Sequence, residues 1–493
     1  MSGDPSIAIA HPERFYIGGE WVPAASPGRR EVVSPSTERV VAVVAEAAEA
    51  DAERAVAAAR RAFDQGPWPR LTPAERATYL HGLAVELRAR IPALRDAWTA
   101  QVGAPIAYSR AMTPAIIDGI DQVARLHERP IWVERQPTIH AGHTGLLVRE
   151  PVGVVAAIVP WNGPLFTLAT KLAPALLAGC TVVIKPAPET PLEAYLLCEC
   201  AEAAGFPPGV INLVVADRAV SDFLVRQPAI DKVSFTGSTV AGKRIAEVCA
   251  QRMARTTLEL GGKSAALILD DVDLDQVAGI LAPTSCRLSG QVCSNLTRYL
   301  VPEAKHDALA DALAARMRAL KVGDPFADDT QMGPIAMRRQ LDKVEHYVAL
   351  GQQEGARLVT GGRRMPGFER GFFYEPTLLG RVDNGSRVAR DEIFGPVIAL
   401  IPYRDLDHAV ALANDSDFGL NGAVFTRDTR LAYDVARRIR TGTVAQNGSK
   451  SDYSIGFGGF KQSGIGREGG LAGVLSYLEP KTVVLEGDFD AGH

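Results

Sequence analysis

The sequence predicts an α/β fold that contains a largely parallel sheet and a second α/β unit. One observation is that short apolar runs such as TVVIKP and KVSFTG alternate with helical stretches, as the strands and helices of βαβ units do. Another is that this alternation restarts after Leu260 with AALILD and TRYLVP. A third is the length of 493 residues, which exceeds one ordinary hydrophobic core and predicts two or three domains.

The composition is that of an ordinary globular protein. Hydrophobic residues make up 47% of the chain and charged residues 22%, which argues against a disordered or fibrous protein. The formal net charge is -4, and no block of Lys and Arg forms a stripe for phosphate backbones. We therefore expect no nucleic acid partner.

Neither a targeting segment nor a membrane anchor is expected. The first residues lack a basic segment followed by an apolar core, and Asp4 and Pro5 interrupt them. The longest apolar runs, at 152–160 and 172–184, are shorter than a membrane span and contain Pro, Gly or polar residues. The six cysteines form no C-x-x-C pair, which argues against a disulfide framework or a zinc site. A reducing cytoplasm is the expected compartment.

The first elements along the chain are helices, followed by a hairpin and the parallel strands. Residues 51–100 show Ala, Arg, Glu and Leu at three- and four-residue spacing, which predicts two amphipathic helices near 52–62 and 74–89. Near residues 129–153, IWVERQPTIH, a Gly-containing turn and LLVREPVGVV predict a β-hairpin that leaves the main body. The apolar runs that follow, with a helix at 192–204 between them, predict a parallel sheet of the nucleotide-binding type.

The second unit repeats this pattern. AALILD and TRYLVP predict strands, with helices near 274–282 and 305–320. Stretches rich in Gly and Pro predict loops at 323–334, 361–371 and 456–470, and SYLEPKTVVLEG predicts a C-terminal strand.

Cys293 is the candidate nucleophile. It lies in GQVCSN, a polar, turn-like stretch after a helical run that ends near Ser285. A thiol in such a loop attacks carbonyl groups if its surroundings lower its pKa from about 8.5. Taken alone, a lone cysteine is more often a small buried hydrophobe, and that interpretation applies to the other five cysteines.

Glu259 is the candidate general base. It ends an apolar and threonine run in TLELGGKS, and the two glycines after it allow a tight turn. By itself, a Glu before Gly-Gly would more often be a solvated loop carboxylate. The pair carries the argument, because the chain between Glu259 and Cys293 is long enough for a strand, a helix and a return to the same cleft.

These motifs together resemble the aldehyde dehydrogenase superfamily. ELGGKS is followed by GQVCSN, with PWNGPL upstream and EIFGPV downstream, in the order and at the spacing of that family. The resemblance extends from about Tyr16 to Val484. It implies a Rossmann-type dinucleotide-binding domain, an α/β catalytic domain and a small β element for oligomerisation.

The resemblance also implies a reaction, in which a cysteine thiolate attacks an aldehyde, hydride leaves to nicotinamide, and the thioester is hydrolysed. By position, Cys293 matches the nucleophile, Glu259 the base that activates water, and Asn162 the amide that stabilises the oxyanion together with a backbone N–H. Without the family, Asn162 would be an ordinary turn residue. Lys171 matches a lysine near the glutamate that assists proton transfer, although an amphipathic helix surface would also explain it.

The expected cofactor is NAD, with NADP also possible. Gly237, Ser238 and Gly242 of SFTGST-x-x-G match the family's dinucleotide loop and open a helix that approaches pyrophosphate. G-x-G-x-x-G at 464–469 is discounted because no apolar strand precedes it. Where many NAD-preferring members have a glutamate, this sequence has Pro188, with Glu189 next to it. The other residues that the resemblance places at the cofactor are Pro160, Trp161, Lys185, Glu392 and Phe394.

Fewer aromatic residues than usual are expected in the aldehyde tunnel. The residues that match its lining are Gly163, Thr167, Thr170, Ser294 and Phe457. Ser294 offers no charge, and no cationic residue for a carboxylate-bearing substrate is evident, so an apolar or aromatic aldehyde is favoured. Gly456 stands where the family often has proline, which loosens the loop that carries Phe457.

We expect a discontinuous dinucleotide-binding domain at 11–128 and 151–259, a catalytic domain at 260–440, and a segment at 441–476 that returns to the active-site cleft. The hairpin at 129–150 and the strand at 477–493 form the oligomerisation element of a homodimer or homotetramer. Three alternatives stay open: a cysteine hydrolase or acyltransferase, a non-catalytic protein that keeps the fold, and a CoA-acylating member. The cofactor residues argue against the hydrolase, because a hydrolase needs no dinucleotide. The intact set of Cys293, Glu259 and Asn162 argues against the non-catalytic protein. The presence of Glu259 argues against CoA acylation, because CoA-acylating members usually lack this glutamate.

Overall fold

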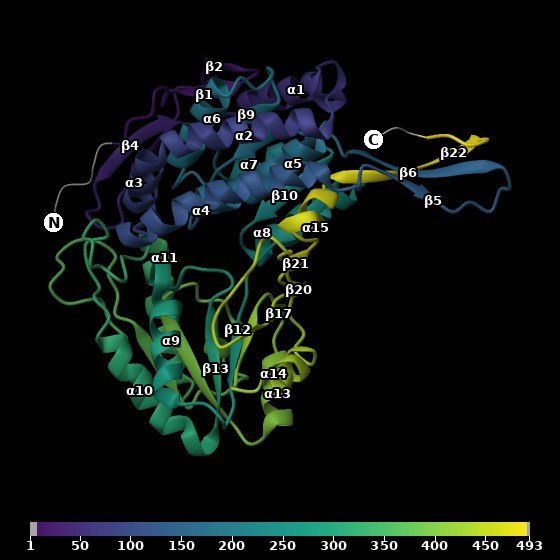
Figure 1. Cartoon of the computed structure of the whole chain (residues 1–493). Coiled ribbons are helices and arrows are strands. Elements are labelled where there is room, and N and C mark those ends of the chain that lie inside the picture. Colours follow the sequence, from purple (N-terminus) through teal and green to yellow (C-terminus); the bar gives the residue numbers. More distant parts are fainter. Residues whose placement is uncertain (1–6, 491–493) are drawn as a thin grey trace.

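The computed structural model describes residues 7–490. Asp4 and Pro5, as well as residues 491–493 of the predicted C-terminal element, lie outside the described residues. Figure 1 shows two bodies, one built mainly from the first half of the chain and the other from its green second half, and a slender arm that projects from the first body. The predicted α/β fold is confirmed.

The first body is organised around a six-stranded sheet of order β21-β11-β10-β7-β8-β9. Its strands are β7 (Val154–Ile158), β8 (Thr181–Lys185), β9 (Ile211–Leu213), β10 (Lys232–Thr236), β11 (Arg255–Glu259) and β21 (Gly464–Ile465). All pairs are parallel except β11 with β21. Every residue of β7, β8 and β10 is buried, which explains their continuous apolar runs. Helices α5 (Pro164–Ala178), α6 (Leu192–Ala203), α7 (Arg218–Arg226) and α8 (Thr239–Ala250) connect the strands.

The N-terminal part contains more elements than its sequence predicts. Helices α1 (Glu49–Asp64) and α2 (Pro73–Ala89) confirm the two expected helices, and α3 (Ile91–Val102) and α4 (Ile106–Ala124) follow them. Two hairpins precede α1: β1 (Arg14–Ile17) with β2 (Glu20–Pro23), and β3 (Arg29–Val33) with β4 (Val40–Ala45). Strands β2, β3 and β4 are only partly buried, so their apolar pattern in the sequence is weak, and the mostly buried β1 is only four residues long.

The second body has a seven-stranded sheet of order β14-β15-β16-β13-β12-β18-β19. Its strands are β12 (Ser264–Ile268), β13 (Leu296–Pro302), β14 (Arg357–Thr360), β15 (Thr377–Gly380), β16 (Val397–Tyr403), β18 (Gly422–Phe425) and β19 (Ala445–Gln446). Its helices are α9 (Leu274–Cys286), α10 (His306–Arg318), α11 (Arg338–Gln353), α12 (Arg387–Arg390), α13 (Leu406–Asn414) and α14 (Thr429–Ala436). α9 and α10 confirm the predicted helices of this unit.

The chain then returns to the first body. β17 (Phe418–Gly419) pairs with β20 (Phe460–Lys461), and β21 joins the first sheet before α15 (Gly470–Leu475). Because β21 lies far along the chain from β11, sequence proximity gives no sign of this pairing.

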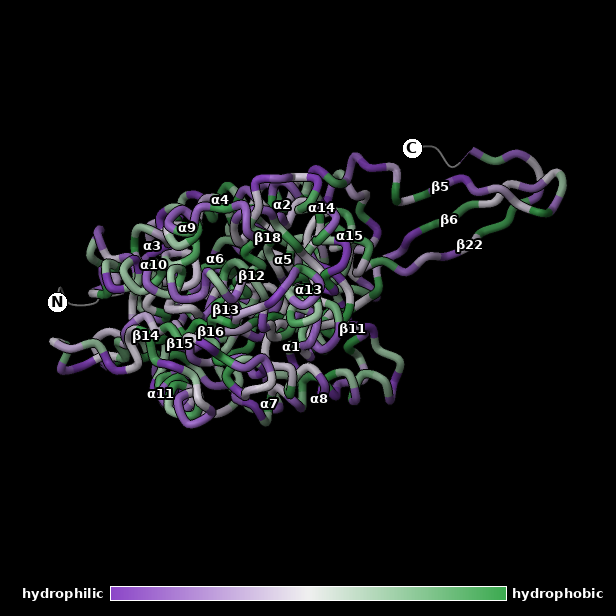
Figure 2. Tube along the Cα trace, turned by 90° about the horizontal axis from the view of Figure 1, so that it is seen from below, coloured by the Kyte–Doolittle hydropathy of each residue, from purple (hydrophilic) through white to green (hydrophobic). Residues whose placement is uncertain are grey.

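The arm is a three-stranded antiparallel sheet. It consists of β5 (Val133–Gln136), β6 (His143–Pro151) and β22 (Leu478–Glu486), and β22 pairs with β6 from Leu478↔Pro151 to Glu486↔His143. Figures 1 and 2 show it extending away from both bodies. The predicted hairpin and C-terminal strand are confirmed, whereas the division into domains stays a prediction. Among residues 7–490, no helix is long and apolar enough to cross a membrane.

Candidate active site

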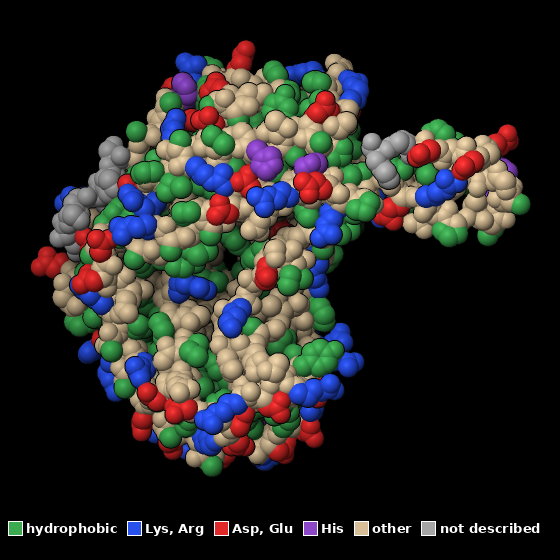
Figure 3. Space-filling view, viewed as in Figure 1, with side chains coloured by type: hydrophobic (Ala, Val, Ile, Leu, Met, Phe, Trp, Pro, Cys, Tyr) green, Lys and Arg blue, Asp and Glu red, His purple; other side chains and the backbone are tan. Residues whose placement is uncertain are grey.

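The predicted site residues converge on a cavity between the two bodies. Parallel strands β7, β8, β10 and β11 all end at the same edge of the first sheet, the edge at which α/β proteins bind ligands. The cavity has a volume of about 550 Å³. Figure 3 shows the surface hollowed between the two bodies.

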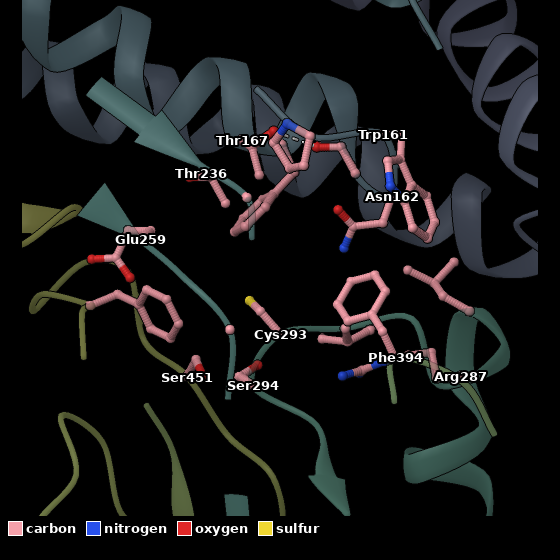
Figure 4. Close-up of a pocket in the computed structure, with 18 of the residues that line it drawn as sticks. Trp161, Asn162, Thr167, Thr236, Glu259, Arg287, Cys293, Ser294, Phe394 and Ser451 are labelled. Carbon is pink, nitrogen blue, oxygen red and sulfur yellow. Dashed lines mark hydrogen bonds between the residues drawn. The ribbon is translucent and has the colours of Figure 1, made fainter. Parts of the chain in front are cut away.

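Most of the predicted residues line this cavity. They are Pro160, Trp161, Asn162, Gly163, Thr167, Gly237, Ser238, Glu259, Cys293, Ser294, Glu392, Phe394 and Phe457. Lys171 lies behind the wall in α5, Lys185 ends β8, and Thr170 lines a neighbouring cavity. Figure 4 shows Cys293 near the centre, with Glu259 on one side and Asn162 and Phe394 on the other.

Cys293 is held by a strained turn after α9. Leu288 and Ser289 are left-handed, with φ of 49° and 54°, which is costly for residues with side chains. Gly290 follows with φ of 72°, and a Cβ there would lie 2.1 Å from the carbonyl oxygen of Gly395. Glycine is therefore required at position 290, where the loop approaches the segment that contains Phe394.

A buried glutamine fixes the other side of this loop. The Gln291 side chain is 1% exposed; its Nε2 donates to the Leu288 carbonyl at 2.9 Å, and its Oε1 accepts from the Ala336 N–H at 3.0 Å. The loop that carries the nucleophile is therefore attached to the second body by side-chain as well as backbone contacts.

The surroundings of Cys293 keep it as a thiol. Burial raises the pKa of Cys293 to about 12, and the carboxylates of Glu392 and Glu259 add to the rise. The Ser294 N–H opposes it. Since the thiolate is the nucleophile, positive charge brought into this cavity would activate Cys293.

Glu259 is the last residue of β11 and is 3% exposed. Burial raises its pKa well above the ordinary value, Glu468 raises it further, and Lys171 and Arg467 oppose the rise. Neither carboxylate oxygen has a hydrogen-bond partner among residues 7–490. A carboxyl group with a raised pKa and free oxygens facing a cavity is suited to act as a general base.

Lys171 forms a buried ion pair with Glu468, although the sequence also allowed a helix-surface position for it. The Lys171 side chain is 0% exposed and that of Glu468 5%. Glu468 also accepts from the Thr170 hydroxyl at 3.3 Å. The surface interpretation of Lys171 is wrong, because α5 is covered by the segment that contains α15.

Asn162 lies in the loop between β7 and α5. Its Nδ2 donates to the Gln291 carbonyl at 2.9 Å, and the Trp98 Nε1 donates to the Asn162 carbonyl at 3.1 Å. An amide NH₂ has two hydrogens, so one remains to be donated into the cavity that holds Cys293. The arrangement links Asn162 to the loop of the nucleophile.

Helix α11 positions the EIFGPV segment. Gln340 Nε2 donates to the carbonyls of Ile393 and Phe394, both at 2.8 Å, and Lys343 Nζ donates to the Glu392 carbonyl at 2.7 Å. Phe394 has φ of 61°, and its ring meets the Trp161 ring edge-on at 5.3 Å. Glu392 Oε1 accepts from the Gly262 N–H at 3.0 Å.

The cofactor side is built from the ends of β8 and β10. Ser238 caps α8, since its hydroxyl accepts from the Ala241 N–H at 3.3 Å. Burial lowers the pKa of Lys185 to about 8, and Glu189 opposes this. Glu189 forms an ion pair with Arg339 of α11 at 2.7 Å, which spans the two bodies.

The expectation that no cationic residue faces the substrate is wrong. Arg287 and Lys450 both line the cavity, and Figure 4 shows Arg287 below the Phe394 ring. Arg287 Nε is buried and has no hydrogen-bond partner among residues 7–490, while its guanidinium lies 5.6 Å from the Tyr108 ring. In the sequence, Arg287 simply follows a helix, where a charged residue is ordinary.

The tunnel also has more aromatic residues than the sequence predicts. Trp98, Tyr108, Phe166 and Tyr453 line the cavity beside Phe457. Trp98 and Tyr108 come from α3 and α4, far from the recognised motifs. Among the site residues that the sequence analysis did not name, Glu468 is the one that a motif could have identified, because it belongs to the GRE of the FGG-x-K-x-SG-x-GRE pattern.

Comparisons with known proteins identify the family. The model of the aldehyde dehydrogenase family matches residues 21–483. Geranial dehydrogenase of Castellaniella defragrans is 43% identical over 98% of this chain and 100% of its own length. The 3-succinoylsemialdehyde-pyridine dehydrogenase of a Pseudomonas species is 40% identical over 95% of this chain and 98% of its own.

Solved structures give the same result. A mutant of aldehyde dehydrogenase C from Pseudomonas syringae, in complex with NAD+ and octanal, has a TM-score of 0.93 and 40% identity and covers 97% of both chains. An aldehyde dehydrogenase of Mycobacterium tuberculosis in complex with NAD+ has a TM-score of 0.93 and 40% identity over 98% of this chain and 100% of that one. The protein is therefore an enzyme of the aldehyde dehydrogenase family.

Proposed function

We propose that the protein oxidises an aldehyde to the carboxylic acid through a thioester on Cys293, with NAD+ as the hydride acceptor. The observation that carries this proposal is the convergence of Cys293, Glu259 and Asn162 on one cavity at the carboxyl edge of the first sheet. A hydrolase would need no dinucleotide groove, and a non-catalytic protein would need no buried glutamate with free oxygens.

The residues on the cofactor side fit a dinucleotide. The N-terminal amides of α8 suit a pyrophosphate, the Lys185 ammonium and Glu392 carboxylate suit ribose hydroxyls, and Phe394 bounds the cavity beside Cys293. The buried Thr236 hydroxyl, which lacks a hydrogen-bond partner among residues 7–490, adds an unused polar group at this edge. NAD+ accepts the hydride from the aldehyde carbon, and the related enzymes from Pseudomonas syringae and Mycobacterium tuberculosis are in complex with NAD+.

The protein's own residues then act in sequence. The Cys293 thiol first releases its proton to solvent, which positive charge in the cavity favours. The thiolate then forms a bond with the carbonyl carbon, whose π electron pair moves to the oxygen, and Asn162 Nδ2 together with a backbone N–H donates to the resulting oxyanion. After the hydride has left, the carbon is bound to sulfur as a thioester. Glu259 takes a proton from water, whose oxygen attacks this carbon, and the sulfur leaves as thiolate. Lys171 and Glu468 tune the pKa of Glu259.

The substrate side favours an apolar or aromatic aldehyde. Five aromatic side chains from α3, α4, α5 and the loop at 451–457 surround the approach to Cys293. The related enzymes act on geranial and on a pyridine-bearing semialdehyde, as their names state. A second candidate class is an aldehyde with a carboxylate at its other end, because Arg287 Nε is buried in the wall of this cavity without a hydrogen-bond partner among residues 7–490.

The decisive experiment follows reduced-nicotinamide absorbance with NAD+ or NADP+ and a panel of aliphatic, aromatic, terpenoid and carboxylate-bearing aldehydes. The native enzyme should turn over, Cys293→Ala should form no reduced cofactor, and Glu259→Gln should give one equivalent per site and then stop. Repeated turnover by Cys293→Ala would contradict the proposal.

Arg287→Leu separates the two substrate classes, since it should impair only the carboxylate-bearing aldehydes if that class is correct.

We also propose that the arm at 129–150 and 477–493 joins subunits into a homodimer or homotetramer. An isolated three-stranded sheet buries little apolar surface. The arm nevertheless projects from the body and exposes apolar side chains, with Ile139 96% and Val484 47% exposed, which another subunit would cover. Size-exclusion chromatography with light scattering tests this. Deletion of residues 477–490 should give a monomer, and an unchanged mass after deletion would contradict the proposal.

A further inference from the structure

A second cavity of about 550 Å³ lies directly behind the substrate side of the first one. It is bounded by α4, α5, the loop at 451–454 and the start of α15. The two cavities share four lining residues, Ile116, Phe166, Ser451 and Tyr453. They are therefore separated by a wall one side chain thick.

Aromatic rings form most of this wall. The Phe166 ring meets the Tyr453 ring edge-on, with centroids 4.8 Å apart, and Tyr453 stacks on Phe457 at 4.6 Å. The loop that carries Tyr453 has glycines with positive φ at both ends, Gly448 at 153° and Gly456 at 155°. Neither glycine has a side chain that restricts the backbone, and a turn of Tyr453 away from Phe166 would join the two cavities.

The lining of the outer cavity is suited to an apolar chain. Val123 of α4 and Leu126 in the turn after it, together with Ala169 and Pro174 of α5, give an apolar floor. The polar side chains Gln122 and Arg125 are exposed and lie at the rim. The far end of a chain held here would reach solvent, while its middle would be buried.

We propose that the outer cavity binds the tail of a long-chain aldehyde, whose carbonyl group reaches Cys293 past the Phe166–Tyr453 wall. The proposal rests on the aldehyde dehydrogenase activity proposed above and specifies its substrate as an apolar aldehyde with an extended chain. Each further methylene that enters an apolar site contributes about 0.8 kcal/mol, or about fourfold in kcat/KM. With a single cavity, kcat/KM would stop rising with chain length once the cavity was filled. With two connected cavities, kcat/KM would go on rising to longer chains.

Gly119 provides a way to fill the outer cavity alone. It lies within α4 and lines the outer cavity but not the catalytic one. A Cβ added there meets nothing within 4 Å, and its φ is not positive. A Cβ at position 119 therefore fits without strain, and Gly119→Leu is designed to fill the outer cavity with the rest of its side chain. Gly279 of α9 has the same open surroundings and lines neither cavity, so Gly279→Leu is the matched control.

The test is kcat/KM for unbranched aldehydes from propanal to dodecanal. We expect the native enzyme and Gly279→Leu to gain steadily with chain length, and Gly119→Leu to match them for short chains but to fall at least about tenfold behind for dodecanal. Ala115→Leu, also confined to the outer cavity, should behave like Gly119→Leu. Equal kinetics of all variants at every length, or an equal loss at every length, would overturn the proposal. Oxidation of other aldehydes but of none of these unbranched ones would also overturn the proposal, whereas failure of the native enzyme to oxidise any aldehyde of the wider panel would instead contradict the proposed function.

Discussion

Replacing Lys171 by methionine should destabilise the protein strongly. Both members of the Lys171–Glu468 pair are almost completely buried, at 0% and 5% side-chain exposure, so the change leaves a carboxylate in the interior without its counter-charge. Breaking such a pair by removing one member costs about 3–5 kcal/mol, whereas replacing both members by apolar residues is often nearly neutral. Lys171→Met should therefore lower the thermal midpoint, and Lys171→Met with Glu468→Leu should restore most of it.

Replacing either member of this pair should also shift the acid limb of the pH–kcat profile, and the two replacements should shift it in opposite directions. Glu468 raises the pKa of Glu259 and Lys171 lowers it. A base with a higher pKa needs a higher pH before it loses its proton, so Lys171→Met should shift the limb to higher pH and Glu468→Gln to lower pH. The double variant should lie between them.

Differential scanning calorimetry gives the stabilities, and pre-steady-state measurement of thioester hydrolysis gives the pH profile. Because the two single variants should shift the pH limb in opposite directions, a loss of fold alone cannot mimic the pattern. Shifts of both single variants in the same direction, or a Lys171→Met protein as stable as the native one, would refute the reasoning.

Three further predictions concern the loops of the site. Asn162→Ala should lower kcat by about 10²–10³, because a donor to the oxyanion is lost, and should lower the thermal midpoint slightly, because the hydrogen bond to the Gln291 carbonyl is lost as well; an unchanged kcat in steady-state assays would argue against that role. Gly290→Ala should destabilise by more than the roughly 1–2 kcal/mol of a left-handed residue, since its Cβ also meets the Gly395 carbonyl at 2.1 Å, and urea unfolding measures this. Gln340→Leu frees two carbonyls near Phe394, so KM for NAD+ should rise more than KM for the aldehyde, and equal rises would count against it.

The sequence predicted the elements that are buried on both sides or have a clear helical period. The strands β7, β8 and β10 and the helices α1, α2, α9 and α10 are of this kind. The N-terminal hairpins escaped prediction because their strands are short and, apart from β1, largely exposed or half-buried. β21 escaped because its partner β11 lies far away in the chain.

The residues of the candidate site likewise fall into those that a local motif predicted and those that only the structure revealed. Cys293, Glu259 and Asn162 carry local motifs, and these identified the family before any distance was known. Arg287, Tyr108 and the outer cavity carry no local motif, because each depends on which helix faces which loop.

By itself, the sequence determined the α/β class, the family and the identity of the residues proposed to react. Only the tertiary structure decided their surroundings: the buried Lys171–Glu468 pair beside Glu259, the arginine in the substrate wall and the aromatic partition between two cavities. The physical reason is that local motifs specify chemical groups and backbone turns, whereas pKa values, burial and cavity shape arise from atoms that distant segments bring within a few ångströms.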